Sequence, residues 1–323
     1  MSRRPGGHRV RTVYLGSGAF GVPALRRLAA HPRIDLVGVV TAPARPVGRH
    51  AVLTRTPIAV LAAELSLSPV LTPERLRVPG AIASVLALEP ALAVLADYGQ
   101  LVPPALLDLP HGALNLHPSA LPRFRGASPV PATIAAGDAQ TAVSLMRMDE
   151  GLDTGPLVAQ ASLSLTGCET APELEAQLAE LGAALLDRSL DAWLDGALAA
   201  TPQPGRGATL TRPLHRVDGR LDPMRTAVEL ERLVRAYRPW PGTYAEVGGE
   251  RLGVAAARVE PGDPADVPGT LVRHGAEPAL ATADGRLVLE RVTPPGRRSM
   301  PGADWLRGRR SPVALSPCQN RRR

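Results

Sequence analysis

Short apolar segments alternate with helix-like segments over the first two-thirds of this 323-residue chain, and this alternation constrains the fold most strongly. The strand candidates are the largely apolar residues 12–15, 36–40, 92–95 and 113–117, and the helix candidates between them are residues 22–30, 58–65 and 81–88. Short buried strands separated by helices are typical of a parallel sheet that helices cover on both faces. The pattern therefore predicts an α/β domain with a mostly parallel sheet, which residues 143–148 and 157–163 extend.

The middle of the chain contains one strong helix signal. Thr170 and Glu173 have the spacing of a capping box, in which a hydroxyl group and a carboxylate satisfy free N–H groups at a helix start. We expect a long amphipathic helix that continues toward Trp193. From Asp195 to about Pro213 the chain is rich in Gly, Pro, Thr and Gln, and this composition predicts an interdomain linker.

The C-terminal third predicts a second, smaller domain. A helix over 227–237 is followed by short strands, with turns at Gly248-Gly249 and Asp284-Gly285 that suit two-residue hairpins. This order indicates a mostly antiparallel, barrel-like β domain. The predicted domains are therefore 1–203 and 214–310, joined by a linker at about 195–213, and residues 311–323 are expected to form a disordered tail.

The charge balance favours a polyanionic partner, although coding bias offers another explanation. The formal net charge is +7, and all 37 basic residues are Arg, with no Lys. An Arg-only chain rich in Ala, Gly and Pro is also what GC-rich coding produces. The two cysteines, Cys168 and Cys318, are far apart, so neither a disulfide framework nor a zinc site is indicated. Without a signal sequence or an apolar run long enough to span a bilayer, the chain is expected to be cytoplasmic, with no membrane partner.

A glycine pattern after the first strand raises the possibility of a dinucleotide site. Gly16, Gly18 and Gly21 fit GxGxxG between a strand and a helix. The pattern also requires an acidic residue at the end of the second strand to bind the ribose, and Val40-Thr41 offers none. We therefore expect these glycines to form a tight turn that a ligand can approach, without NAD.

Three polar residues form the strongest candidate site. Asn115 and His117 are two residues apart on a predicted strand, so they project from the same face near its carboxyl end. Asp153 lies in the separate Gly-Leu-Asp-Thr-Gly turn and could pair with the imidazole. An amide, a histidine and a carboxylate together can move protons and stabilise a developing oxyanion. A strand that simply ends in a polar loop would explain one such residue, but it explains three less well.

These residues belong to motifs that resemble the methionyl-tRNA formyltransferase family. The motifs are the Leu15–Leu25 segment, Asp97-Tyr98-Gly99-Gln100, the block from Asn115 to Gly126, Met148–Gly155 and Pro239-Trp240-Pro241. The resemblance extends over nearly the whole chain. It implies a Rossmann-like, mostly parallel sheet with the formyltransferase fold, followed by an OB-like β-barrel that binds tRNA. Asp97 differs from the family pattern, which has a small residue there.

The resemblance implies transfer of the formyl group of 10-formyltetrahydrofolate to the α-amino group of methionine on initiator tRNA. Asn115 would donate a hydrogen bond to the formyl oxygen, His117 would donate a charged hydrogen bond to the same oxygen, and Asp153 would take the proton of the amine. The implied folate contacts are Ser119, Ala120, Leu121 and Pro122, and the implied tRNA contacts are Arg45 and Arg49. The enzyme is expected to act as a monomer without a metal.

Two other functions remain open at this point. A formyltransferase acting on an amino sugar or a nucleotide sugar would use the same three residues, and a catalytically silent RNA-binding protein would keep only the fold. The intact set of Asn115, His117 and Asp153 argues against the silent protein. The basic loop around Arg45 and the β domain argue, less firmly, against the sugar enzyme.

Overall fold

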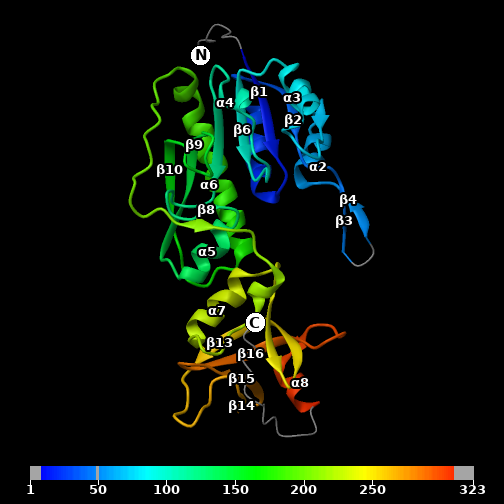
Figure 1. The fold of residues 1–323 in the computed structure, drawn as a ribbon, viewed down its shortest axis with the longest axis vertical. Coiled ribbons are helices and arrows are strands. Elements are labelled where there is room, and N and C mark those ends of the chain that lie inside the picture. The colour runs from blue at the N-terminus through cyan, green and yellow to red at the C-terminus, as the bar shows by residue number, and fades with distance from the viewer. Residues whose placement is uncertain (1–8, 49–50, 309–323) are drawn as a thin grey trace, which may run out of the picture. The chain divides into compact units, whose positions relative to one another are not determined.

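The computed structural model describes residues 9–48 and 51–308, so Arg49 and the predicted tail 311–323 lie outside the described residues. The described chain forms two compact units (Figure 1). The first unit comprises residues within 1–129, 140–164 and 175–211. The second comprises residues within 130–139 and 165–174 together with those from Arg212 onward. The sequence pattern does not indicate that the segments 130–139 and 165–174 belong to the second unit.

A seven-stranded, mostly parallel sheet forms the centre of the first unit. In spatial order its strands are β10 (Leu157–Ser164), β9 (Gln140–Arg147), β7 (Ala113–His117), β6 (Leu92–Ala96), β1 (Val10–Gly16), β2 (Ile34–Val40) and β5 (Val70–Leu71). Only the pairs that involve β9 are antiparallel. The helices are α1 (Val22–Ala30), α2 (Pro57–Glu64), α3 (Pro79–Leu86), α4 (Pro104–Leu107) and most of α6 (Ala171–Leu194). The predicted α/β fold is confirmed.

Both faces of this sheet are buried, as continuously apolar strands require. Val13 and Leu15 point into one apolar cluster that also contains Leu106. Tyr14, which projects from the opposite face, is fully buried as well. On the part of the sheet near β7 and β9, α6 packs closely, because a Cβ added at Gly182 would lie 3.2 Å from the Val143 side chain.

The strand order of the sheet reverses at β1. From β1 the chain moves outward to β2 and β5, and it then crosses over to β6 on the other side of β1. Open α/β sheets bind ligands where the strand order reverses in this way. The turn after β1 is joined to the end of β6, because the backbone N–H of Ser17 donates to the Asp97 carbonyl at 2.9 Å. The next strand beyond β6 is β7, which carries Asn115 and His117.

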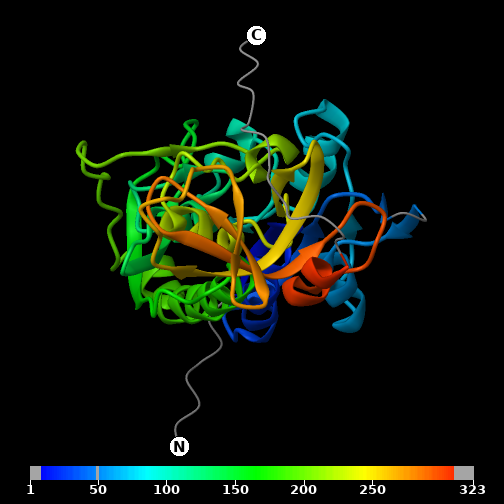
Figure 2. The same cartoon turned by 90° about the horizontal axis from the view of Figure 1, so that it is seen from below.

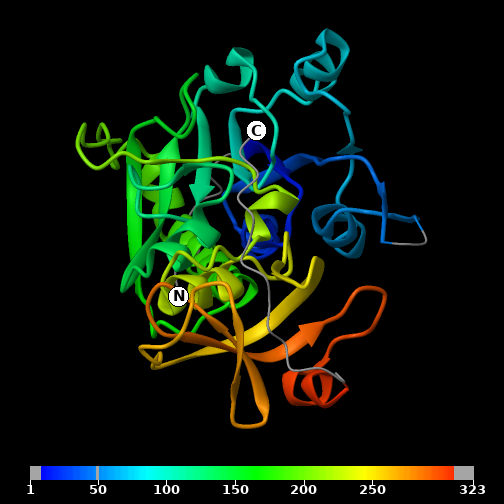
Figure 3. The same cartoon turned by 60° about the horizontal axis from the view of Figure 1, so that its bottom comes forward.

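The second unit is built around an antiparallel sheet with one long helix, α7 (Ala227–Ala236). Its strands are β12 (Thr243–Val247), β13 (Glu250–Glu260), β16 (Arg286–Thr293), β15 (Glu277–Ala281) and β14 (Leu271–His274), and β17 (Met300–Pro301) pairs with β16. Figures 2 and 3 show these strands, in yellow to orange-red, curling instead of lying flat. The unit also contains the short helices η2 (Arg216–Gly219) and α8 (Gly302–Arg307), and nearly all of α5 (Pro129–Ala136) belongs to it. The predicted OB-like β domain is confirmed.

Of the two predicted two-residue hairpin turns, one is confirmed and the other is wrong. Val247 pairs directly with Glu250, so Gly248-Gly249 is a two-residue turn, and both glycines have positive φ, as such a turn requires. At the other turn Ala281 pairs with Arg286, so the loop contains four residues and the prediction of a two-residue turn at Asp284-Gly285 was wrong. The Thr282 hydroxyl stabilises the longer loop by donating to the carbonyls of Asp284 and Gly285.

The segment predicted as a linker is hydrogen-bonded to the first unit over much of its length. Thr201 exchanges two backbone hydrogen bonds of 2.7 Å with Leu157. Further on, β11 (Leu210–Thr211) pairs in parallel with β8 (Arg125–Gly126). These ladder contacts place the segment 201–211 beside the loop that follows β7.

Candidate active site

Strand β7 positions Asn115 and His117 at the carboxyl edge between β6 and β9. Asn115 lies opposite Leu95 on one side and Met146 on the other, and His117 lies opposite Ser144. The Asn115 side chain is half-buried, and its amide makes no hydrogen bond to any residue that the structure describes. A fixed strand therefore carries an amide whose hydrogen-bonding capacity is available to a ligand.

The structure brings His117 and Asp153 together, as the sequence predicts. His117 Nδ1 lies 3.6 Å from Asp153 Oδ2, and the His117 side chain is only 6% exposed. The distance is that of an ion pair and is longer than a hydrogen bond, and contacts of this kind commonly tighten when substrate binds. On its other side His117 Nε2 lies 2.9 Å from the carbonyl oxygen of Phe124, to which it can donate. Both ring nitrogens thus face groups of the protein, so this geometry fixes the ring instead of pointing a nitrogen at open solvent.

The Asp153 carboxylate is held from one side only. Its Oδ2 accepts a hydrogen bond of 2.7 Å from the backbone N–H of Gly126. No residue that the structure describes donates a hydrogen bond to Oδ1. Asp153 itself has a φ of 52°, a left-handed conformation that Asp tolerates better than most residues. One carboxylate oxygen therefore orients the group, and the other is available to accept a proton.

The loop after β7 is fixed by polar contacts beneath it. Ser119 is fully buried, and its hydroxyl donates to the carbonyl oxygen of Arg123 at 2.7 Å. The Ser144 hydroxyl donates to the Ser119 carbonyl and accepts from the Leu121 N–H, and the Gln160 amide donates to Ser144 at 2.8 Å. Of the four predicted folate contacts, Ser119, Leu121 and Pro122 are buried and Ala120 is half-buried. The loop can therefore offer a ligand Ala120 and a firm backbone surface, but not the Ser119 hydroxyl.

Asp97 sits directly at the glycine turn. A Cβ added at Gly18 would lie 1.5 Å from Asp97 Oδ2, so the missing side chain of Gly18 provides the space for this carboxyl group. Asp97 is exposed as a residue, but the protein around its carboxyl group desolvates the charged form and raises the pKa of Asp97 above its usual range. The pKa of Glu175 on α6 is also raised, by burial and by the charge of Asp97. A carboxyl group at this turn opposes a pyrophosphate, which is a second reason against dinucleotide binding.

Tyr98 leaves one polar atom unsatisfied at the same edge. It follows Asp97 directly and packs in the apolar cluster of Leu95 and Val102. Among the described residues its hydroxyl is the buried side-chain polar atom without a hydrogen-bond partner. Burial raises the pKa of Tyr98 to about 12, so the hydroxyl stays protonated at neutral pH. The Tyr98 hydroxyl and the Asn115 amide are thus two polar groups for which the described residues provide no hydrogen-bond partner, and of the two only Asn115 is half-buried and not enclosed.

Arg45, one of the two predicted tRNA contacts, lies on a projecting hairpin. Arg45 begins β3 (Arg45–Val47), which pairs only with β4 (Val52–Thr54), and in Figure 1 this hairpin extends away from the sheet. Arg45 forms an exposed ion pair of 3.2 Å with Glu74, a type of contact that adds little stability and can be exchanged for another partner. Arg49, the second predicted contact, lies outside the described residues.

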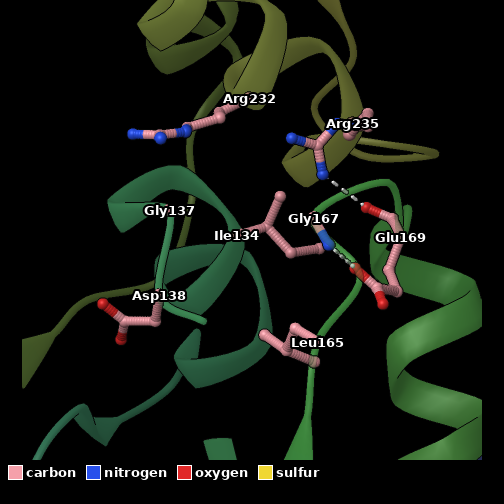
Figure 4. A pocket seen from close by; sticks show the side chains of 8 residues that line it. All are labelled: Ile134, Gly137, Asp138, Leu165, Gly167, Glu169, Arg232 and Arg235. Atoms are coloured by element: carbon pink, nitrogen blue, oxygen red, sulfur yellow. Dashed lines mark hydrogen bonds between the residues drawn. The ribbon is translucent and has the colours of Figure 1, made fainter. Parts of the chain in front are cut away.

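The second unit contains a small pocket that differs in character from this edge (Figure 4). It lies between the end of α5 (Pro129–Ala136), the segment before α6, and α7. Arg235 donates to the Glu169 carbonyl at 2.9 Å, and the carboxylates of Asp138 and Glu169 offset the charges of Arg232 and Arg235. Of the predicted site residues that the structure describes, none lines this pocket, and its balanced charges favour no particular ligand.

Sequence reasoning missed the residues that hold the site together. Gln203 bridges the Asp153 turn and Arg125, and Ser144 and Gln160 support the loop after β7. No local pattern identifies them, because each acts through backbone groups of segments distant in sequence. Within residues 9–48 and 51–308 no three His, Cys, Asp or Glu side chains are grouped as a metal site would require. In the same residues no helix is both long and apolar enough to cross a membrane.

Comparison with known proteins decides the family. The formyl transferase family model matches residues 10–190, and the model of the formyl transferase C-terminal domain matches residues 213–310. The methionyl-tRNA formyltransferase of Roseiflexus sp. (strain RS-1) is 45% identical over 303 residues, covering 93% of both chains. That of Myxococcus xanthus (strain DK1622) is 42% identical over 311 residues, covering 96% of this chain and 98% of the relative. This chain belongs to the methionyl-tRNA formyltransferase family. It is therefore a one-carbon group transferase.

Solved structures support the fold independently. An N-formyltransferase from Helicobacter canadensis, in complex with folinic acid and dTDP-3-aminofucose, matches with a TM-score of 0.62 and 13% identity, over 87% of this chain and 98% of that one. A 4-N formyltransferase from Francisella tularensis matches with a TM-score of 0.61 and 16% identity, over 77% of this chain and 98% of that one. At these identities the likeness concerns the fold alone. Formyltransferases of this family use formyltetrahydrofolate, which agrees with the predicted co-substrate.

Proposed function

We propose that this enzyme transfers the formyl group of 10-formyltetrahydrofolate to the α-amino group of methionine on initiator Met-tRNA. Relatives named methionyl-tRNA formyltransferase match over almost the full length of the chain, including both domains. The observation that carries the proposal is the unpartnered amide of Asn115, held at a sheet edge beside the His117–Asp153 pair.

The residues at this edge suit acyl transfer to an amine. When bound, 10-formyltetrahydrofolate supplies a formyl group on nitrogen. Asn115 can donate its amide hydrogen bond to the formyl oxygen, on which negative charge grows. Asp153 Oδ1, which is not engaged by the described residues, can accept the proton of the attacking amine directly or through a water. The same proton can then pass to N10 of the folate, as the bond between N10 and the formyl carbon breaks and tetrahydrofolate leaves. His117 keeps the carboxylate oriented, because its Nδ1 faces Oδ2 at 3.6 Å.

The unsatisfied groups fit a folate. The pterin ring system carries several polar atoms on a flat aromatic body, so it suits a surface that combines apolar packing with isolated donors. Ala120 and the firm backbone after it provide the packing surface, and the half-buried Asn115 amide provides an isolated donor. Ser144 and Gln160 hold the backbone of this loop in place through their hydrogen bonds to it and to each other.

In this proposal the C-terminal domain binds tRNA through arginines that carboxylates do not neutralise. The Arg216 guanidinium lies over the Trp240 ring at 5.6 Å, and that of Arg251 lies over the Tyr244 ring at 4.6 Å. Neither arginine forms an ion pair with the described residues, and Trp240 is 51% exposed. Exposed arginine and aromatic side chains can bind phosphates and stack on bases. In contrast, Arg258 contacts three glutamates and is not available.

The hairpin that carries Arg45 is the second proposed tRNA contact, together with Arg49. Since the ion pair of Arg45 with Glu74 is exposed, a phosphate can replace the carboxylate at little cost. The enzyme is further proposed to act as a monomer, and light scattering in solution at working concentration tests that assignment.

One experiment separates the proposed function from its competitors. Purified protein is incubated with 10-formyltetrahydrofolate and either Met-tRNA or a nucleotide-linked amino sugar, and formylation of each acceptor is measured. Formylation of initiator Met-tRNA, with little on the sugar, is expected. Preferential formylation of the sugar would establish the other enzyme class, and RNA binding without any formylation would indicate a catalytically silent protein.

A further inference from the structure

Among the described residues around the candidate site, Gln203 forms the most side-chain hydrogen bonds, although it lies in the segment whose composition predicts a linker. Its amide Nε2 donates to the carbonyl oxygens of Asp153 at 2.9 Å and Gly155 at 2.8 Å. Its Oε1 accepts from Arg125 Nη2 at 2.7 Å and Nε at 3.1 Å. One side chain thus makes four hydrogen bonds, all to two short segments.

These two segments meet at the Asp153 carboxylate. One is the turn from Asp153 to Gly155, and the other is β8, in which Gly126 follows Arg125 and donates its N–H to Asp153 Oδ2. Gln203 therefore joins the backbone that carries the carboxylate to the strand that orients it. The direction of the carboxylate toward His117 Nδ1 depends on both segments keeping this spacing.

The Asp153 turn has few other restraints toward the sheet edge. On its outer side the Gly151 N–H and the Thr154 hydroxyl donate hydrogen bonds to Asp149, within the same turn, and to no other residue that the structure describes. Leu152 is exposed at the tip. Gly155 is closely fitted, because a Cβ there would lie 2.0 Å from the Arg147 carbonyl. Between this fixed point and the exposed tip, the two bonds from Gln203 hold the backbone of Asp153.

We infer that Gln203 is a positioning residue for formyl transfer, which acts by holding the Asp153 carboxylate against His117. Gln203 makes no hydrogen bond to His117 or Asn115, so its effect on the reaction passes through Asp153. The inference rests on the proposed function for its kinetic test, and it has a structural test that does not.

Two substitutions separate the roles of the amide. Gln203→Glu keeps an acceptor for Arg125 but loses the donor to the carbonyls of Asp153 and Gly155, whereas Gln203→Met removes both without adding charge. Both variants should lower kcat by about 10- to 100-fold, as expected when a reacting group is misplaced by about 1 Å. KM for Met-tRNA and for folate should change less than about twofold, because no substrate contact is removed. Gln177→Glu, the same chemical change on the exposed side of α6, should match the wild type.

A double substitution tests whether the effect passes through Asp153. In an Asp153→Ala background, Gln203→Met should lower kcat by less than about twofold further, because the group that it positions is gone. A full additional loss in that background would overturn the inference. Equal kcat losses for Gln203→Glu and Gln177→Glu would overturn it as well.

Hydrogen exchange provides a readout that does not require activity. The Gly126 N–H is protected by its bond to Asp153 Oδ2. Both Gln203 variants should exchange this hydrogen faster than the wild type at equal global stability, and unchanged protection would refute the positioning role. If the wild type formylates a different acceptor, the proposed function fails. The Gly126 measurement and the ratio of variant to wild-type rates on that acceptor still test Gln203.

Discussion

Replacing Asn115 with Ala should separate catalysis from stability more cleanly than any other change at the site. The Asn115 amide makes no hydrogen bond within the described residues and is half-buried, so its removal leaves no internal partner unsatisfied. The free energy of unfolding should therefore change by less than about 1 kcal/mol. Loss of one donor to a developing oxyanion lowers the rate by about 100- to 1,000-fold, or about 2.7–4 kcal/mol of transition-state stabilisation.

Asp153→Ala is the matched comparison, because this change should lower both the rate and the stability. This change removes the acceptor of the Gly126 N–H and the charge that faces His117 Nδ1. Leaving a buried donor without a partner costs about 1–3 kcal/mol of stability. For a unit of this size, each kcal/mol lowers the melting temperature by about 2–4 °C. Asp153→Ala should therefore lose both rate and several degrees of thermal stability, whereas Asn115→Ala should lose rate alone.

The assay is single-turnover formylation of Met-tRNA with saturating 10-formyltetrahydrofolate, accompanied by thermal unfolding of each variant. Two outcomes would contradict the reasoning. Asn115→Ala could retain a rate within about threefold of the wild type, in which case its amide is not the oxyanion donor. Alternatively, its melting temperature could fall as far as that of Asp153→Ala, which would mean that Asn115 has a structural partner after all.

Three further predictions concern charges elsewhere in the chain. Arg216→Ala should weaken tRNA binding and reduce the salt dependence of binding by about one phosphate contact. The control Arg225→Ala removes an arginine that is already paired with Glu229, so it should change affinity and salt dependence less. Equal effects of the two substitutions would argue against Arg216 as a tRNA contact. Desolvation of the Asp97 carboxyl group raises its pKa, so its ionisation opposes folding. Because Asp97 is an exposed residue, Asp97→Asn should raise the melting temperature only slightly near pH 8, and the gain should shrink as the pH falls; a constant gain would refute the cause. The hydrogen bond from Arg212 lowers the pKa of Asp218 to about 2 from 3.8. The ionised Asp218 therefore stabilises the fold above about pH 4, and this contribution to the free energy of unfolding is lost as the pH falls toward 2. The Asp218→Asn variant should not show this loss of stability in acid.

The regular elements of the first unit could be predicted because their sequence periodicity and burial agree. The helix predicted over 22–30 and the strand predicted over 113–117 coincide with α1 and β7. The capping signal also has a physical counterpart, since the Thr170 N–H donates to the Glu173 carboxylate at 2.9 Å at the start of α6. The strand placed Asn115 and His117 on one face by geometry alone, and the carboxylate of Asp153, in a separate turn, was recognised from its residue type as a possible partner of the imidazole.

The irregular segments could not be predicted, because long-range hydrogen bonds determine their structure. Strands β8 and β11 have two residues each, too short to show any periodicity. The hydroxyl of Thr209 accepts from the Phe124 N–H, and that of Thr211 accepts from the Ser128 N–H, and these contacts join residues more than 80 positions apart. A stretch rich in Gly, Pro, Thr and Gln has the composition of a linker whether or not its polar groups have such partners.

The difference between regular elements and segments that depend on long-range hydrogen bonds explains why only part of the site could be predicted from the sequence. A side chain that meets substrate must have a particular chemistry, so Asn115, His117 and Asp153 could be named from residue type and spacing. A side chain that supports the site must only match backbone groups brought to it by the fold. Gln203 binds two carbonyl oxygens and Ser144 binds one carbonyl and one N–H, and such groups occur in every segment of any chain. The supporting residues therefore become identifiable only when the segments that they join are seen together, as the Asp153 turn and β8 are where Gln203 joins them.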